Sequence, residues 1–164
     1  MEFNDMAALA FHFAKAAARE PVVLENGLEK CAVHIEGLAK DEIGHYQSSV
    51  GPFPAWAELA DSPEQQKAAH GYPVDAPLLA SGEMREAITH EVSGFEAAIG
   101  VKDDDAGKKL IYHELGTSKM PAQPVLGPAA FRGKEFIIRT IGHAAVSGMI
   151  GGEQIHSSPG YEGK

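Results

Sequence analysis

The sequence predicts an α+β domain with two N-terminal helices, a small antiparallel sheet and a C-terminal helix packed on that sheet. Three patterns predict this class: apolar residues at helical spacing before residue 44, alternating apolar residues between 88 and 101, and a second helical spacing after residue 128. A chain of 164 residues with 44% hydrophobic content is long enough to bury a core, and residues 1–150 are assigned to one domain. Residues 151–164 lack periodicity and are predicted to form a flexible C-terminal tail.

The first helix is expected over residues 3–19. Its apolar stripe consists of Met6, Leu9, Ala10, Phe13 and Ala17. Pro21 lacks an amide donor and is expected to end this helix. The stripe resumes in a second helix over residues 24–43, which Gly44 ends. Each apolar stripe must be buried against a partner surface, which is either a sheet or the other helix. Alternatively, part of the first stripe is an interface.

Residues 47–79 form a loop region, because glycine and proline recur there at short intervals. Within it, Ser62-Pro63-Glu64 predicts the start of a short helix. Trp56 and Leu59 are expected to pin the loop to the core, and the alternative is an exposed tryptophan that stacks on a ligand. Long structureless loops are uncommon in compact domains, so part of this one is expected to be mobile or ordered by a neighbouring subunit.

A β-hairpin is predicted in the middle of the chain. Apolar residues alternate over residues 88–92 and again over 95–101, and Ser93-Gly94 supplies the turn. The acidic run at residues 103–105 is expected to be a solvated N-terminus of a short helix over residues 106–115. It lacks the Asp-x-Asp-x-Asp-Gly spacing of a calcium loop.

A proline-rich loop follows this short helix, which Gly116 closes. Pro121 and Pro124 each fix the backbone and remove a donor, so residues 117–127 are predicted to be an extended surface loop. Pro128 is typical of the first turn of a helix, and the apolar spacing after it predicts a helix over residues 129–147.

Composition excludes several kinds of partner. The formal net charge is −9 and no cluster of Lys and Arg is present, which argues against nucleic-acid binding. No apolar run approaches the roughly 20 residues of a membrane span. The start of the chain is acidic where a secretory signal is basic. We therefore expect a soluble protein made in the cytoplasm, without a membrane partner.

The candidate chemical residues do not form a catalytic motif. His113-Glu114 lacks the second histidine of the His-Glu-x-x-His zinc motif, and the other histidines are scattered singly. Cys31 is the only cysteine and lies on an apolar helix face, where a buried inert thiol is expected. The sequence therefore predicts neither an enzyme nor a bound metal or cofactor.

A motif runs from Tyr112 through Glu114, Gly116 and Thr117 and a proline-rich loop to Pro128-Ala129. Upstream positions continue it: Trp56, Lys67, Gly71, Leu79, Gly82, Arg85 and Ile88. In order and spacing, this pattern resembles the tail-component and neck (tail-completion) protein family of long-tailed lambdoid bacteriophages and the related phage virion-morphogenesis proteins. The chain departs from the family pattern by an apolar substitution at two positions where phenylalanine is commoner, Leu115 and Val125.

The resemblance implies a structural virion protein at the neck or head-proximal tail, made in the cytoplasm of the bacterial host. It implies a homo-oligomeric ring between head-completion or connector proteins and tail-terminator or tail-tube proteins, with DNA passing through the channel without specific binding. One alternative is a prophage-encoded soluble assembly factor that is not retained in the particle. A third hypothesis, from another class, is a small metal-dependent enzyme using His113 and Glu114.

Two sets of residues are the candidate site. The proposed oligomer or partner interface lies in the loop 118–127 and consists of Met120, Pro121, Pro124, Val125 and Leu126. These side chains are apolar in a segment that proline keeps extended, although Val125 and Leu126 alternatively pack inward. The structural motif residues are Trp56, Leu79, Gly82, Arg85, Tyr112, Glu114, Gly116, Thr117 and Pro128. Glu114 is expected to accept hydrogen bonds from amides in the turn after Gly116, with Thr117 and Ser118 as donors.

Overall fold

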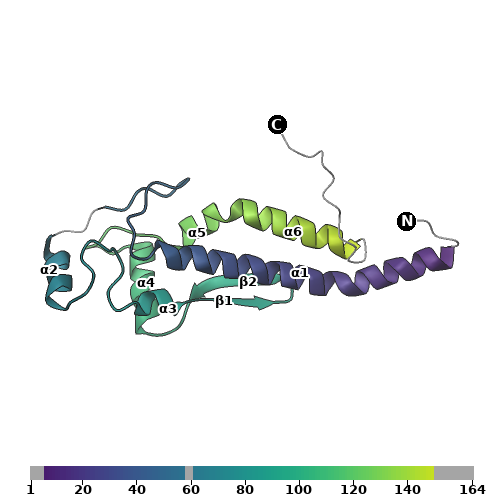
Figure 1. Ribbon diagram of the computed structural model, residues 1–164, viewed down its shortest axis with the longest axis horizontal. Helices are drawn as coiled ribbons and strands as arrows, with labels where there is room; N and C mark the ends of the chain where they lie inside the picture. Colours follow the sequence, from purple (N-terminus) through teal and green to yellow (C-terminus); the bar gives the residue numbers. More distant parts are fainter. Residues whose placement is uncertain (1–5, 58–60, 150–164) are drawn as a thin grey trace.

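The protein is built around one long helix, which lies between the C-terminal helix on one side and a two-stranded hairpin on the other (Figure 1). The computed structural model describes residues 6–57 and 61–149. The elements are α1 (Met6–Glu42), α2 (Asp61–Ala69), α3 (Glu83–Ala87), β1 (Ile88–Ser93), β2 (Glu96–Val101), α4 (Asp105–Leu115), α5 (Leu126–Arg132) and α6 (Lys134–Met149). The α+β class is confirmed. Leu59 and the expected flexible tail lie outside the described residues.

The helix α1 runs through Pro21 without a break, so the prediction of two separate N-terminal helices is wrong. An internal proline removes one hydrogen bond and crowds the preceding turn, which can bend a helix without ending it. Figure 1 shows a bend in the N-terminal part of α1. Pro21 is exposed, and α6 supports the turns on both sides of it, where Gly148 lies against Glu20 and Gly27 against Ala144.

The helix α6 lies antiparallel along α1, not on the sheet as predicted (Figure 1). A Cβ atom added to Gly27 would lie 3.0 Å from Cβ of Ala144, so glycine permits the close approach. Farther along, the His34 ring stacks on Phe136 with centroids 4.0 Å apart. Because α1 carries buried residues on more than one face, it packs against both α6 and the hairpin and separates them.

The C-terminal helical segment is divided at Gly133, whereas one helix over residues 129–147 was predicted. The backbone at Gly133 comes so close to Ile35 of α1 that a Cβ atom there would overlap the isoleucine side chain. The first piece, α5, also begins at Leu126, two residues before Pro128. The close contact of Gly133 with α1 therefore accounts for the break between α5 and α6.

The hairpin is confirmed, but its turn is formed by Gly94 and Phe95, one residue later than the predicted Ser93-Gly94. The strands β1 and β2 pair antiparallel, from Ile88 opposite Val101 to Ser93 opposite Glu96. Gly94 has φ +59°, the left-handed conformation that a tight two-residue turn requires. Phe95, the second residue of this turn, is exposed.

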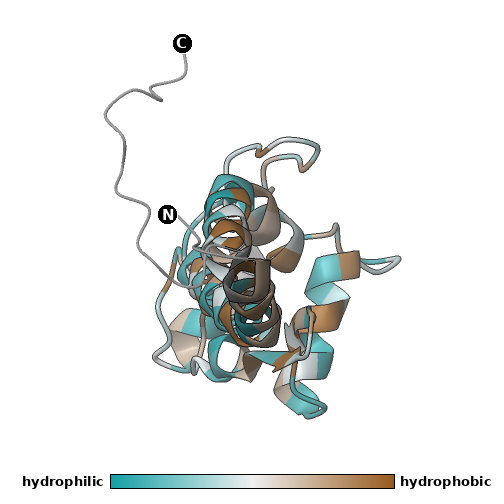
Figure 2. Ribbon diagram, turned by 90° about the vertical axis from the view of Figure 1, so that its right-hand side faces the viewer, coloured by the Kyte–Doolittle hydropathy of each residue, from teal (hydrophilic) through white to brown (hydrophobic). Residues whose placement is uncertain are grey.

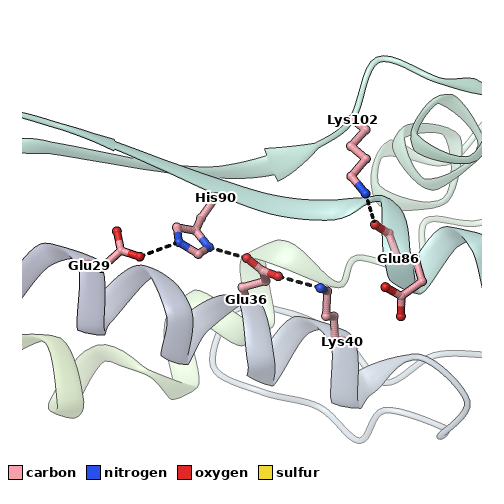
Figure 3. Close-up of polar contacts among 6 residues, drawn as sticks. All are labelled: Glu29, Glu36, Lys40, Glu86, His90 and Lys102. Carbon is pink, nitrogen blue, oxygen red and sulfur yellow. Dashed lines mark hydrogen bonds and ion pairs between the residues drawn. The ribbon is translucent and has the colours of Figure 1, made fainter.

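A polar network attaches the hairpin to α1 (Figure 3). His90 of β1 lies between two carboxylates of α1, forming one ion pair with Glu36 and another with Glu29, where Nε2 and Oε1 are 3.1 Å apart. Lys40 pairs with the other oxygen of Glu36 at 2.6 Å. Hydrogen bonds that the His90 ring donates to Glu36 and Glu29 raise the pKa of His90, so the charged imidazolium is favoured in the folded state. At the end of the hairpin, Lys102 donates to the Glu86 carbonyl.

One cluster of buried apolar side chains joins these elements. It contains Ile35, Ala39, Ile43, Trp56, Leu78, Ile88, Leu110, Val125 and Ala129. The predicted burial of Trp56 and Cys31 is confirmed. The acidic turn is also confirmed as a helix N-terminus, because Oδ1 of Asp104 accepts the backbone N–H of Gly107 at 2.7 Å. The short helix expected after Ser62 is present as α2.

The continuity of α1 through Pro21 predicts that Pro21→Ala raises stability. Alanine restores the missing backbone hydrogen bond and relieves the crowding, which in a helix interior is worth about 3 kcal/mol. Urea unfolding followed by circular dichroism measures the change. Pro54→Ala, at an exposed loop proline, is the control and should change the unfolding free energy little. A lower stability for Pro21→Ala would contradict this account.

Candidate interaction site

The carboxylate of Glu114, near the end of α4, lies at the N-terminus of α5. Its three backbone donors are Val125 N–H at 2.6 Å and Leu126 N–H at 3.1 Å, both to Oε2, and Gly127 N–H at 3.1 Å to Oε1. Amides at a helix start have no partner within the helix, and a negative acceptor is favoured there. The Glu114 carboxylate is therefore a structural cap that connects α4 to α5.

Glu114 accepts hydrogen bonds from backbone amides as predicted, but the donors are not the predicted ones. The amides come from the start of α5 and not from the turn after Gly116. Thr117 is instead paired with Met120 in an isolated β-bridge, and its Oγ1 accepts the Lys119 N–H at 3.3 Å. The turn closes on itself, so its amides do not need the carboxylate.

The loop 117–127 is held to the body of its own chain at two further points. The backbone N–H of Gln123 donates to the His113 carbonyl at 2.7 Å, and Oε1 of Gln123 lies 3.2 Å from Nδ1 of His113. Nε1 of Trp56 donates to the Pro124 carbonyl at 3.2 Å. Burial lowers the pKa of His113, which favours the neutral ring beside Gln123. Gln123 is itself buried, and nothing in its sequence context indicated this.

These contacts correct the predicted interface. Val125 and Pro124 are buried in the chain's own core, so they are not available to a partner. Leu126 is half-buried and packs against the same core. The helix cap and the tryptophan hydrogen bond turn these side chains inward, which was the alternative left open. Of the predicted interface residues, only Pro121 is exposed, and Met120 is half-buried.

Three upstream motif residues support the same region from the end of α1. Nη2 of Arg85 donates to the Ile43 carbonyl at 2.7 Å, just after the last turn of α1. Leu79 is half-buried against the core and packs over Gly44, whose φ is +103°. Gly82, with φ +90°, provides the left-handed residue before α3.

The remaining motif residues differ in exposure. Gly116 has φ +72°, and a Cβ atom there would lie 2.8 Å from the Ala122 backbone nitrogen, so glycine is required in this turn. Pro128 is buried in the first turn of α5, where its missing donor is not needed. Tyr112 is exposed and makes no contribution to the core.

A buried polar cluster that the sequence did not reveal lies beside the cap. Glu42 of α1 is 6% exposed and its Oε1 pairs with Nη1 of Arg132 at 2.7 Å. Burial raises the pKa of Glu42 to about 7; the Arg132 charge opposes this shift and the nearby Glu114 charge adds to it. Oε2 of Glu42 and both side-chain polar atoms of Gln47 have no hydrogen-bond partner among the described residues. These residues border a cavity of about 200 Å³.

An apolar groove of about 450 Å³ lies on the adjacent surface, between the loop 50–53 and the helices α5 and α6. Two aromatic rings form its floor by packing on glycines: Phe53 on Gly127, and Phe131 on Gly51. A Cβ atom on Gly127 would lie 2.6 Å from the Phe53 ring, so the approach requires glycine. Ile138, which is 63% exposed, lines the groove on α6.

No group of three His, Cys, Asp or Glu side chains within residues 6–57 and 61–149 could hold a metal ion. The Glu114 carboxylate is occupied by three amides, and His113 faces Gln123. Within the same ranges, no helix combines the length and the apolar character needed to cross a membrane.

Comparison with protein-family models, with curated proteins and with solved structures gives no match for this chain.

The cap predicts that Glu114→Gln lowers the unfolding free energy by about 1.5–3 kcal/mol, because the amide offers one neutral acceptor where the carboxylate offers two charged ones. Denaturant unfolding measures the loss. Glu91→Gln, at an exposed position of β1, is the matched control and should be close to neutral. Equal stability of the two variants would rule out a structural role for the cap.

The raised pKa of Glu42 predicts that stability falls as pH rises from about 4.5 to about 7. Across this window the folded state holds a proton that the unfolded state has released, so the contribution of Glu42 to the unfolding free energy declines and then levels off. At about 1.4 kcal/mol per pKa unit, the decline is on the order of 3 kcal/mol. Unfolding titrations at several pH values measure it.

Glu42→Gln removes the titrating group and should abolish this decline. Asp41→Asn, at a neighbouring exposed carboxylate, is the matched control and should retain the decline. A decline of the same size in Glu42→Gln would show that another group causes it.

Proposed function

We propose that this chain is a structural virion protein of a tailed phage or phage-derived particle, a neck or tail-completion component that joins head and tail as a homo-oligomeric ring. The resemblance of residues 56–141 to that family carries the proposal. Its neighbours would be head-completion or connector proteins on one side and tail-terminator or tail-tube proteins on the other.

The way in which the motif residues cooperate supports this proposal. Glu114 caps α5, Trp56 holds the loop before α5, and Arg85 holds the end of α1. Residues far apart in the sequence thus serve one region of the fold. These contacts stabilise the fold, which is compatible with a structural role for the chain.

Exposed apolar side chains favour assembly over a solitary monomer. Large hydrophobic residues are exposed on α1, on the hairpin turn, and on α5 and α6. Met6, Phe11 and Phe13, on the first turns of α1, are 78%, 72% and 60% exposed. Where such side chains adjoin, an exposed apolar patch commonly marks a protein interface.

The charge of the chain is compatible with a channel through which DNA passes without specific binding. The net charge of −9 leaves no excess of cations to neutralise phosphates. The enzyme hypothesis is weakened, because the carboxylate it needs is occupied by backbone amides.

A soluble assembly factor encoded by a prophage is the second candidate. The same exposed apolar surfaces would serve transient contacts with other assembly proteins. The two candidates differ in whether the chain stays in the finished particle.

The proposal is tested in particles from a strain that encodes the chain. Peptide mass mapping of purified particles should find the protein, and deleting its gene should leave heads and tails unjoined until an intact copy is restored. Light scattering of the purified protein should show a multiple of the 17.4 kDa chain. Absence from joined particles, with the gene still required, would select the assembly-factor alternative. Normal particles after deletion would exclude both.

A further inference from the structure

The polar cavity beside the end of α1 is lined by buried and exposed polar residues. Its buried lining includes Glu42 and Gln47, which are 6% and 5% exposed. Asp41, His45 and Ser48 also line it and are exposed. Figure 2 looks along α1 from its N-terminal end, so the cavity lies at the far end of the helix, away from the exposed apolar side chains of its first turns.

The two buried residues of this lining carry three polar atoms that have no hydrogen-bond partner among the described residues. These atoms are Oε2 of Glu42 and both Oε1 and Nε2 of Gln47. Buried polar side-chain atoms are nearly always hydrogen-bonded, so three such atoms at one cavity indicate a site for a polar ligand. A water molecule takes a share of about 30 Å³ in the liquid, so a cavity of about 200 Å³ has room for a ligand of several non-hydrogen atoms.

The charges around the cavity favour a cation. Among the described residues that line it, Asp41 and Glu42 are acidic and Arg132 is basic. Arg132 pairs only with Oε1 of Glu42, at 2.7 Å, and the charge of the nearby Glu114 also acts on Glu42. The pKa of Glu42 is raised to about 7 despite Arg132, which means that one cation does not fully stabilise the buried carboxylate. A second positive charge beside Oε2 would stabilise it further.

The unpartnered atoms also indicate which kind of cation fits. Oε2 of Glu42 and Oε1 of Gln47 are acceptors, so the cation must carry N–H donors. A guanidinium group is planar, carries several N–H donors in fixed directions, and is more weakly hydrated than an ammonium group, which favours its transfer into a buried site. The third atom, Nε2 of Gln47, is a donor that a water molecule or a carbonyl oxygen of the ligand can accept.

We propose that this cavity binds a guanidinium group, whose N–H donors are accepted by Oε2 of Glu42 and Oε1 of Gln47. The group belongs either to a free guanidino compound or to an arginine side chain, and the experiment below distinguishes these two sources. The site is formed by one chain alone, so the inference does not rest on the proposed virion function.

Titration of the purified chain with methylguanidinium at pH 8 and constant ionic strength tests the site. Nuclear magnetic resonance follows the side-chain amide of Gln47 and the backbone amide of Ser48, and both signals should shift in a saturable manner. Tetramethylammonium has the same charge but no N–H donor, and urea has N–H donors but no charge. Each should bind about tenfold more weakly, or less tightly still, because it lacks one of the two features that the site recognises.

Two substitutions in the lining should weaken the binding of methylguanidinium, followed at Ser48. Gln47→Leu removes two unpartnered buried atoms, so this variant should be at least as stable as the original chain and yet bind about tenfold more weakly. Glu42→Gln keeps the shape of the side chain but removes its charge, and it should weaken binding by a similar factor. Glu91→Gln, at an exposed carboxylate of β1, is the matched control and should bind normally.

The affinity should also fall as the pH is lowered from 8 to about 6, because a proton on Glu42 competes with the bound cation. The other charged or titratable groups around Glu42 are Arg132 of α5, Glu114 of α4, and Asp41, His45 and Tyr46 near the end of α1. A proton on His45 would also repel a cation. His45→Gln should therefore retain the pH dependence, whereas Glu42→Gln should lose it.

Several results would overturn the inference. Absence of a saturable shift with methylguanidinium would show that the cavity holds water only. Equal binding of methylguanidinium, tetramethylammonium and urea, or normal binding by a folded Gln47→Leu variant, would show that the contact is nonspecific or lies elsewhere. Acetyl-arginine amide distinguishes the two sources: binding as tight as that of methylguanidinium supports an arginine side chain as the ligand, and binding of methylguanidinium alone supports a free guanidino compound.

Discussion

Three backbone amides at the start of α5 donate hydrogen bonds to the carboxylate of Glu114. These hydrogen bonds determine the course of the chain between α4 and α5. The cap fixes α5 relative to α4 and thereby places Val125 in the core. Its charge also acts on the neighbouring cluster, because it adds to the rise in the pKa of Glu42. The negative charge of Glu114 is thus stabilised by the helix amides but repels the carboxylate of Glu42. The positive charge of Arg132 offsets part of this repulsion.

The long helix α1 determines which surfaces are left for other molecules. Its central turns are covered by α6 and by the hairpin, and His90 ties the hairpin to it through Glu29 and Glu36. Its first turns carry the exposed side chains of Met6, Phe11 and Phe13. The packing of α6 and the hairpin on α1 therefore leaves large apolar side chains exposed at the N-terminal end of the helix.

Sequence patterns predicted the features of the fold that depend on local interactions. The hairpin, the capped α4 and the buried Trp56 follow from alternation, turn residues and apolar character. The failures arose where tertiary contacts override local preference. Pro21 stays inside α1, and Val125 faces inward because a carboxylate eleven residues earlier in the chain holds its amide. The pairing of Glu42 with Arg132, 90 residues away, leaves no periodic trace in the sequence.

The hydrogen bond between the Trp56 indole and the Pro124 carbonyl has a spectroscopic consequence. Trp56 is the only tryptophan in the chain, so the indole emission of the protein comes from one position, against the loop that precedes α5. Loss of that bond would expose the ring to water and shift its emission to longer wavelength. The chain therefore contains an intrinsic optical probe of this loop, which distinguishes local opening from a change at the far end of α1.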